Sequence, residues 1–218
     1  TLSDGEIELP SIYRDGQIMS KHFDGYVEYY YQVEQGTQPI KQQKYYDEAG
    51  VPTGLWTDYY PNGEVKEHHT PEESVSYRPN GKLRKKEYYL AGWRKTRQRD
   101  GGMIKTLYDK EGKLESMALS FESGRTWSVG FHPNGAIESV YIKEPKLSWN
   151  HFDDGSIRSE YTYTKNDKLK SKWFDKGKKQ PTNPPAWQTK ALENPDPYTR
   201  EKLKVFFEMV EATQKEKN

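Results

Sequence analysis

The sequence predicts an all-β protein, in which tandem β-hairpins form an antiparallel meander and an extended twisted sheet, followed by one C-terminal α-helix. Three observations lead to this prediction. The 218 residues include 17 Tyr, 6 Trp and 7 Phe although only 32% are hydrophobic, so the chain has enough aromatic surface to fold around a thin core. A Pro-Asn-Gly turn recurs along the chain. Near Gln180 the strand-like alternation gives way to a Pro-rich stretch, and a helical pattern follows from Asp196.

The turn motif is complete at residues 61–63, 79–81 and 133–135. Proline presets φ for a type I turn, and glycine takes the left-handed position that closes a three-residue hairpin loop. Looser copies lie at residues 14–16, 48–50, 110–112, 153–155 and 176–177, with weaker turn signals between them. Turns then recur roughly every 9 to 14 residues, which predicts about fifteen or sixteen short antiparallel strands before residue 180.

The segments between turns alternate as strands do. In "EVKEH", alternation predicts that Val65 and Glu67 share one face while Lys66 and His68 share the other. Aromatic residues precede the strong turns, and we expect stacked hairpins to align them in rows along one face. Because an isolated hairpin is marginally stable, residues 1–179 are expected to form one hairpin-repeat domain that is stable only collectively.

The segment "GLWTDYYPNGEVKE", residues 54–67, resembles the MORN-type hairpin repeat, whose units read Gly, an aromatic residue, then Tyr and an Asn-Gly turn. The aliphatic and charged residues after the turn resemble the variant repeat of bacterial antitoxins of the YwqK type. The resemblance spans residues 10–178, and the stretch 90–105 departs from it by lacking the Gly-aromatic pattern. It implies a bacterial antitoxin or immunity protein that binds and neutralises a cognate toxin or effector.

The C-terminal part of the sequence lacks the strand-like alternation of the preceding segments. Residues 180–197 contain five prolines, so we expect a Pro-rich linker over 180–195. Residues 196–216 are expected to form a helix, with Asp196 as its cap and Pro197 at its first position. Its apolar stripe at i, i+3, i+4 and i+7 consists of Leu203, Phe206, Phe207 and Val210. The stripe predicts a helix packed on the sheet, and the alternative is a helix that docks into a partner's groove.

The sequence contains no recognisable motif for catalysis or metal binding. The chain has no cysteine, which excludes disulfides and thiolate sites. Adjacent His68 and His69 should point to opposite faces, whereas His132 and His151 occupy matching repeat positions and could lie near each other as surface residues. No G-x-S-x-G, GxGxxG, P-loop or EF-hand spacing occurs. We therefore expect no catalytic residue, no metal site, no cofactor and no enzymatic activity.

One basic cluster stands out in "GWRKTRQRDGG", residues 92–102, where the repeat pattern fails. Arg and Trp dominate protein interfaces, so this cluster is a candidate partner-binding patch. It consists of Trp93, Arg94, Lys95, Arg97 and Arg99. The alternative is a solvated strand face that nearby acids such as Glu87 and Glu115 neutralise.

The net charge of +1 argues against nucleic acid as a partner and leaves two binding functions open. The first is the antitoxin or immunity protein. The alternative is a MORN-like scaffold or peripheral membrane protein that binds lipid headgroups, which would present a lopsided positive face. The chain begins at Thr1, from which we expect an exported, periplasmic protein whose leader was removed, with a cytoplasmic location as the alternative. No run of eighteen apolar residues predicts a transmembrane helix.

Overall fold

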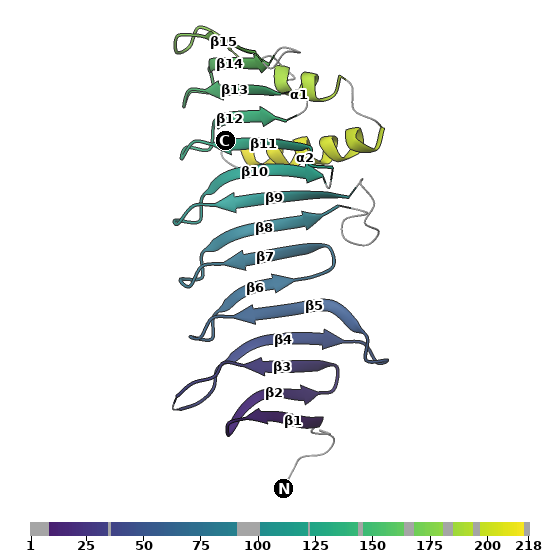
Figure 1. The fold of residues 1–218 in the computed structure, drawn as a ribbon. Coiled ribbons are helices and arrows are strands. Elements are labelled where there is room, and N and C mark those ends of the chain that lie inside the picture. The colour runs from purple at the N-terminus through teal and green to yellow at the C-terminus, as the bar shows by residue number, and fades with distance from the viewer. Residues whose placement is uncertain are drawn as a thin grey trace. The chain divides into compact units, whose positions relative to one another are not determined.

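A computed structural model describes residues 9–34, 36–90, 101–121, 123–143, 146–163, 168–180, 185–193 and 197–215. It confirms the predicted fold class. Within these residues a 15-stranded antiparallel sheet places each strand beside its neighbours in sequence order, and helices follow at the C-terminal end (Figure 1). Neither helix is long and apolar enough to cross a lipid bilayer.

The chain divides into two compact units, residues 1–86 and 87–218. The strands of unit 1 are β1 (Leu9–Arg14), β2 (Gln17–Phe23), β3 (Tyr26–Tyr30), β4 (Ile40–Tyr46), β5 (Pro52–Tyr59), β6 (Val65–His69) and β7 (Glu73–Tyr77). β8 (Leu83–Tyr89) crosses the boundary. The strands of unit 2 are β9 (Gly102–Tyr108), β10 (Leu114–Phe121), β11 (Thr126–Phe131), β12 (Ile137–Ile142), β13 (Leu147–His151), β14 (Ile157–Tyr163) and β15 (Leu169–Trp173).

The turns that follow β5, β7, β9, β11 and β13 share one geometry. At residues 60–64, the N–H of Tyr60 donates to the carbonyl of Glu64 (2.8 Å), and the N–H of Gly63 donates back to the carbonyl of Tyr60 (2.9 Å). Gly63 has φ +84°, a left-handed conformation that glycine adopts without steric cost. The same pair of hydrogen bonds closes the turns at residues 78–82, 109–113, 132–136 and 152–156. Within each unit these turns follow one another along the left-hand edge in Figure 1.

In β6, the strand that follows the turn at residues 60–64, the side chains do not alternate regularly between the two faces of the sheet. Tyr59 pairs with Val65 but Asp58 pairs with Glu67, so Lys66 is an extra residue in a β-bulge. The bulge places Val65 and Glu67 on opposite faces of the sheet. The predicted shared face for these two residues is therefore wrong, because alternation assumes one partner per residue.

Unit 2 has an apolar core between its sheet and helix α2 (Pro197–Lys215). The predicted stripe of Leu203, Phe206, Phe207 and Val210 is buried, as are the alternate residues of β10 to β12 that face it, such as Met117 and Leu119. The Gln214 side chain donates to the carbonyl of Gly135 (2.9 Å), which adds a polar contact near the helix end. The helix is thus packed on the sheet, as the apolar stripe predicts.

A second, short helix, α1 (Ala186–Ala191), lies within the segment expected to be an extended linker. Pro185 begins it with an extended conformation, and the following six residues contain neither Pro nor Gly. Trp187 packs edge-on against Phe207 of α2, with ring centroids 5.2 Å apart. Burial of this indole explains why a helical turn forms in a Pro-rich segment. The predicted cap, Asp196, lies outside the described residues.

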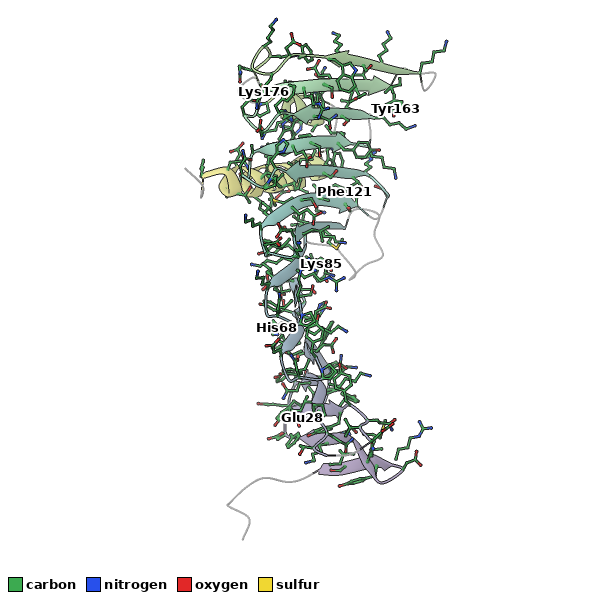
Figure 2. All side chains as sticks on the ribbon, turned by 90° about the vertical axis from the view of Figure 1, so that its left-hand side faces the viewer. Glu28, His68, Lys85, Phe121, Tyr163 and Lys176 are labelled. Atoms are coloured by element: carbon green, nitrogen blue, oxygen red, sulfur yellow. The ribbon has the colours of Figure 1, made fainter. Side chains whose placement is uncertain are left out.

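Unit 1 has no comparable apolar core. Among its described side chains, the only buried apolar ones are Val27 and Val75. The buried polar side chains are Ser20, Glu28, Thr57, Ser74 and Ser76. Figure 2 shows side chains standing on both sides of this part of the ribbon, where Glu28 and His68 are labelled. Unit 1 is therefore a single-layer sheet with two solvated faces.

Candidate binding surface

One face of unit 1 carries a continuous row of residues across five strands. Glu28 pairs with Gln43, Gln43 with Thr57, Thr57 with His68, and His68 with Val75. Directly opposed residues share a face, and so do residues two positions away on the same strand. The same face therefore includes Tyr30, Tyr45, Tyr59 and Tyr77, and we call it the tyrosine face.

A hydrogen-bond network centred on Gln43 fixes the tyrosine face. The Tyr59 hydroxyl donates to Gln43 Oε1 (2.6 Å), and Gln43 Nε2 donates to Glu28 Oε1 (2.9 Å). The Tyr30 hydroxyl donates to the other carboxylate oxygen of Glu28. Glu28 is only 8% exposed, so these bonds replace water around its carboxylate. The network holds these four side chains in one arrangement before any partner binds.

The phenols of Tyr30 and Tyr59 stay protonated in the neutral pH range. Burial, followed by the hydrogen bond and the negative charge of Glu28, raises the pKa of Tyr30 above its ordinary value. Burial, then Tyr45 and Glu28, also raises the pKa of Tyr59. The hydroxyls therefore act as neutral hydrogen-bond donors and supply no acid or base near pH 7.

A shallow hollow of about 580 Å³ lies on this face over β5 to β8. Its lining residues are Thr57, Tyr59, Val65, His68, Glu73, Val75, Tyr77 and Lys86. Thr57 Oγ1 lies 3.1 Å from His68 Nδ1, so the Nε2 of His68 is the ring atom that can meet a ligand. The hollow combines aromatic rings, one carboxylate and one ammonium.

The opposite face of unit 1 also carries aromatic side chains. Trp56 stacks on the cross-strand His69 with ring centroids 4.7 Å apart. The ammonium of Lys44 lies 5.2 Å from the ring centroid of Tyr29. The prediction that the aromatic residues line one face is therefore wrong for unit 1, because residues of both parities along its strands are aromatic.

A second hollow, of about 620 Å³, lies between the turn at Asp24-Gly25 and the turn after β4. Its lining includes the carboxylates of Asp24, Asp47 and Glu48. Asp47 Oδ1 accepts from the backbone N–H groups of Ala49 (3.0 Å) and Val51 (2.8 Å). This carboxylate therefore stabilises its own turn.

The predicted partner-binding residues are outside the described part of the chain. Trp93, Arg94, Lys95, Arg97 and Arg99 all fall within residues 91–100, between the described segments that end at residue 90 and resume at residue 101. The patch stays a prediction.

His132 and His151 lie close together, as their matching repeat positions suggested, with His132 Nε2 3.1 Å from the carbonyl oxygen of His151. His151 is only 6% exposed, so its prediction as a surface residue is wrong. It projects to the same face as Trp149, which belongs to the core. Burial, and then the proximity of His132, lowers the pKa of His151. Across the described segments no group of three His, Asp or Glu side chains could hold a metal ion.

Comparison with known families supports the repeat assignment. The family described as MORN repeat variant matches residues 52–70 and 73–91. The first match contains the β5–β6 hairpin and the second contains the β7–β8 hairpin. The chain therefore carries MORN-type repeats, and the two matched hairpins supply the lining of the hollow over β5 to β8. No curated protein matches the chain.

Among solved structures, the chain is similar to the crystal structure of TcdB2-TccC3 without its hypervariable C-terminal region, at 10% identity and a TM-score of 0.18. It is also similar to the TcdB2-TccC3-Cdc42 structure (9% identity, TM-score 0.14). These matches cover 75% and 71% of this chain but only 14% and 13% of the other chains. A Bacteroides fragilis protein with unknown function, BF3112, matches at 8% identity, over 78% of this chain and 92% of that one, with a TM-score of 0.15.

Proposed function

We propose that the chain is a non-enzymatic binding scaffold that recognises another protein through the tyrosine face of unit 1. The observation that carries this proposal is the Gln43 network, which holds Tyr30 and Tyr59 beside a buried carboxylate on an open sheet. The finer form of the proposal is an antitoxin or immunity protein that covers and blocks a cognate bacterial toxin or effector. That form rests on the resemblance of residues 54–67 to the variant antitoxin repeat.

Rigid tyrosines suit protein recognition for a thermodynamic reason. A tyrosine has only two side-chain torsions and offers a large contact area with a polar tip, so ordering it costs little entropy. Binding affinity depends more on a few such anchors than on total area. The hollow over β5 to β8 is lined by Tyr59 and Tyr77 together with the polar side chains of His68, Glu73 and Lys86. A peptide segment with both charged and apolar side chains fits this chemistry.

The absence of enzymatic activity belongs to the same proposal. The phenols of Tyr30 and Tyr59 have raised pKa values, so they are poor bases at neutral pH. The acids of the hollow between the turns stand in solvent, and Asp47 is engaged in its own turn. Neither these two phenols nor Asp47 is therefore arranged for proton transfer.

The experiment is capture of partners by the full chain, followed by a toxin-rescue assay with the captured protein. We expect Tyr59→Ala with Tyr77→Ala to weaken binding by at least tenfold, about 1.4 kcal/mol or more, because interface tyrosines are frequent hot spots. Tyr13→Ala is the matched control, since Tyr13 is 61% exposed on β1, away from the tyrosine face. Undiminished binding by the double variant would contradict the role of the tyrosine face.

The basic patch and the lipid alternative have their own assays. If Trp93, Arg94, Lys95, Arg97 and Arg99 contact the partner, reversing the four cations to Glu will weaken capture, and unchanged capture would remove the patch from the proposal. A lipid-binding scaffold would instead co-sediment with vesicles that contain phosphatidylserine, and salt would reverse this binding. Vesicle binding without a protein partner would therefore replace the toxin proposal. Fractionation of the source cells tests the predicted export.

A further inference from the structure

The last strand of the sheet has an unpaired edge within the described part of the chain. β15 pairs only with β14. The N–H of Phe174 donates to the carbonyl of Arg158 (3.0 Å), so alternation directs the backbone groups of Leu169, Ser171 and Trp173 away from β14. Every residue of β15 is exposed. Such an edge is a template on which another strand can add.

The two faces of β15 differ in chemistry. Lys172 pairs with Glu160, which pairs with the core residue Trp149, so Lys170 and Lys172 lie on the face that the helices cover in unit 2. Leu169 and Trp173 lie on the other face and are 54% and 62% exposed. An added strand would therefore meet lysines with one set of alternate side chains and apolar surface with the other.

The charge of this edge is strongly positive. Residues 168–180 contain six lysines and one carboxylate. Glu160 accepts from Lys179 (2.6 Å), so its carboxylate is already engaged. Within the described residues Lys170 and Lys172 form no ion pair. Two copies of β15 would repel each other, whereas an acidic strand would be attracted.

The chain itself contains a complementary sequence. Residues 4–9 read Asp-Gly-Glu-Ile-Glu-Leu, so carboxylates alternate with Gly5, Ile7 and Leu9. In a strand, the carboxylates would project to one face and Ile7 and Leu9 to the other. Residues 4–8 lie outside the described part of the chain, and Leu9 begins β1.

We propose that residues 4–9 of one copy of this chain add as a strand to the β15 edge of a second copy. In an antiparallel register Glu6 faces Lys172 and Glu8 faces Lys170. Ile7 and Leu9 then lie on the face of Trp173 and Leu169. The contact joins two different surfaces, so each copy can both give and receive a strand, and the assembly grows head to tail unless it closes into a ring.

Sedimentation of the full chain from micromolar to millimolar concentration tests the proposal. We expect the average mass to rise with concentration at low salt and to fall toward the monomer at high salt, because exposed charge pairs are screened. A wild-type chain that stays monomeric at every concentration in low salt would overturn the proposal.

Charge reversal identifies the two surfaces. We expect Glu6→Lys with Glu8→Lys to abolish association, and Lys170→Glu with Lys172→Glu to do the same, because each variant opposes like charges. An equimolar mixture of the two variants should associate again, since each supplies the surface that complements the other. Circular dichroism verifies that each variant keeps its β-sheet.

The control reverses two exposed lysines elsewhere, Lys41→Glu with Lys66→Glu, and should associate as the wild type does. Association of either reversal variant alone at wild-type strength, or failure of the mixture to associate, contradicts the pairing of residues 4–9 with β15. Failure of partner capture through the tyrosine face would leave these outcomes unchanged, so the two proposals are tested separately.

Discussion

Unit 1 and unit 2 use the same hairpin turn but are stabilised by different interactions. In unit 2 the buried side chains are mainly apolar and lie under α2, with Leu203 and Phe206 fully buried. In unit 1 the most buried side chains are mainly polar, and hydrogen bonds such as Gln43 to Glu28 cross its strands. The comparison shows that the hairpins of this chain do not all require an apolar core.

The difference begins in the strand sequences. β10 places Met117, Leu119 and Phe121 at alternate positions, so one face of the strand is apolar and needs a cover. β4 reads IKQQKYY, in which neither face is purely apolar. A helix on unit 1 would have to bury polar groups without partners, whereas water and cross-strand hydrogen bonds satisfy them in the open sheet.

The largest effect is expected in the core of unit 2. Phe206→Ala should lower the free energy of unfolding of unit 2 by about 3–5 kcal/mol, because it leaves a cavity between α2 and the sheet. Urea unfolding combined with hydrogen exchange reports which unit opens. Val205→Ala is the matched control, since Val205 neighbours Phe206 but is 38% exposed. Equal losses for the two variants would contradict the packing of α2.

A smaller effect is expected in the network of unit 1. Gln43→Ala should lower the free energy of unfolding of unit 1 by about 1–3 kcal/mol. The reason is that it removes a hydrogen-bond partner from the buried carboxylate of Glu28 and from Tyr59. Amide exchange in β3 to β5 should accelerate while β10 to β12 are unchanged. Lys41→Ala, on the same strand but exposed, is the control. Unaltered exchange after Gln43→Ala would show that the network does not stabilise unit 1.

Replacing the glycine of the shared turn should cause the same loss of stability in both units. Gly63 in unit 1 and Gly155 in unit 2 have φ +84° and +81°, and a Cβ on either glycine would meet no atom within 4 Å. We therefore expect Gly63→Ala and Gly155→Ala each to lower the free energy of unfolding by about 1–2 kcal/mol through backbone strain alone. Thermal unfolding of the two variants checks this, with Gly→Asn at the same positions as the milder control. A large difference between the two sites would indicate that the turns are not equivalent.

The smallest effect is a pH dependence confined to unit 2. The pKa of His151 is lowered below its ordinary value of 6.5, so the folded state binds this proton less readily than the unfolded state. The stability of unit 2 should therefore fall as the pH drops below 6.5, and the loss should be complete below the lowered pKa. His151→Gln should flatten this dependence, whereas His69→Gln in unit 1 should not. If the stability of unit 2 depended on pH in the same way in His151→Gln, another titrating group would be its cause.

Much of the fold could be predicted from local sequence. Turn glycines with positive φ, such as Gly63 and Gly135, and the helical stripe of Leu203 and Phe206 lie where the sequence placed them, because turn chemistry and helical spacing are local properties. The burial of His151 could not be predicted, since it depends on which sheet face α2 covers. Pairing across the sheet is a non-local property that one sequence does not display.

The candidate binding surface was harder to predict than the fold. The Gln43 network joins β3, β4 and β5, and only the register shows that Glu28, Gln43 and Thr57 share a face. The bulge at Lys66 moves Val65 onto the face of His68, which simple alternation excludes. Tyrosine enrichment was the one signal in the sequence that pointed to this surface. It did not distinguish the two faces.

Native-state hydrogen exchange of the full chain tests the central contrast most directly. Amides of β10 to β12, beneath α2, should open only with free energies near that of global unfolding of unit 2. Amides of β4 to β6 should open at lower free energies, because that sheet has no apolar layer over it. Equal protection of the two sets, or stronger protection of β4 to β6, would contradict the contrast between the open polar sheet of unit 1 and the helix-covered sheet of unit 2.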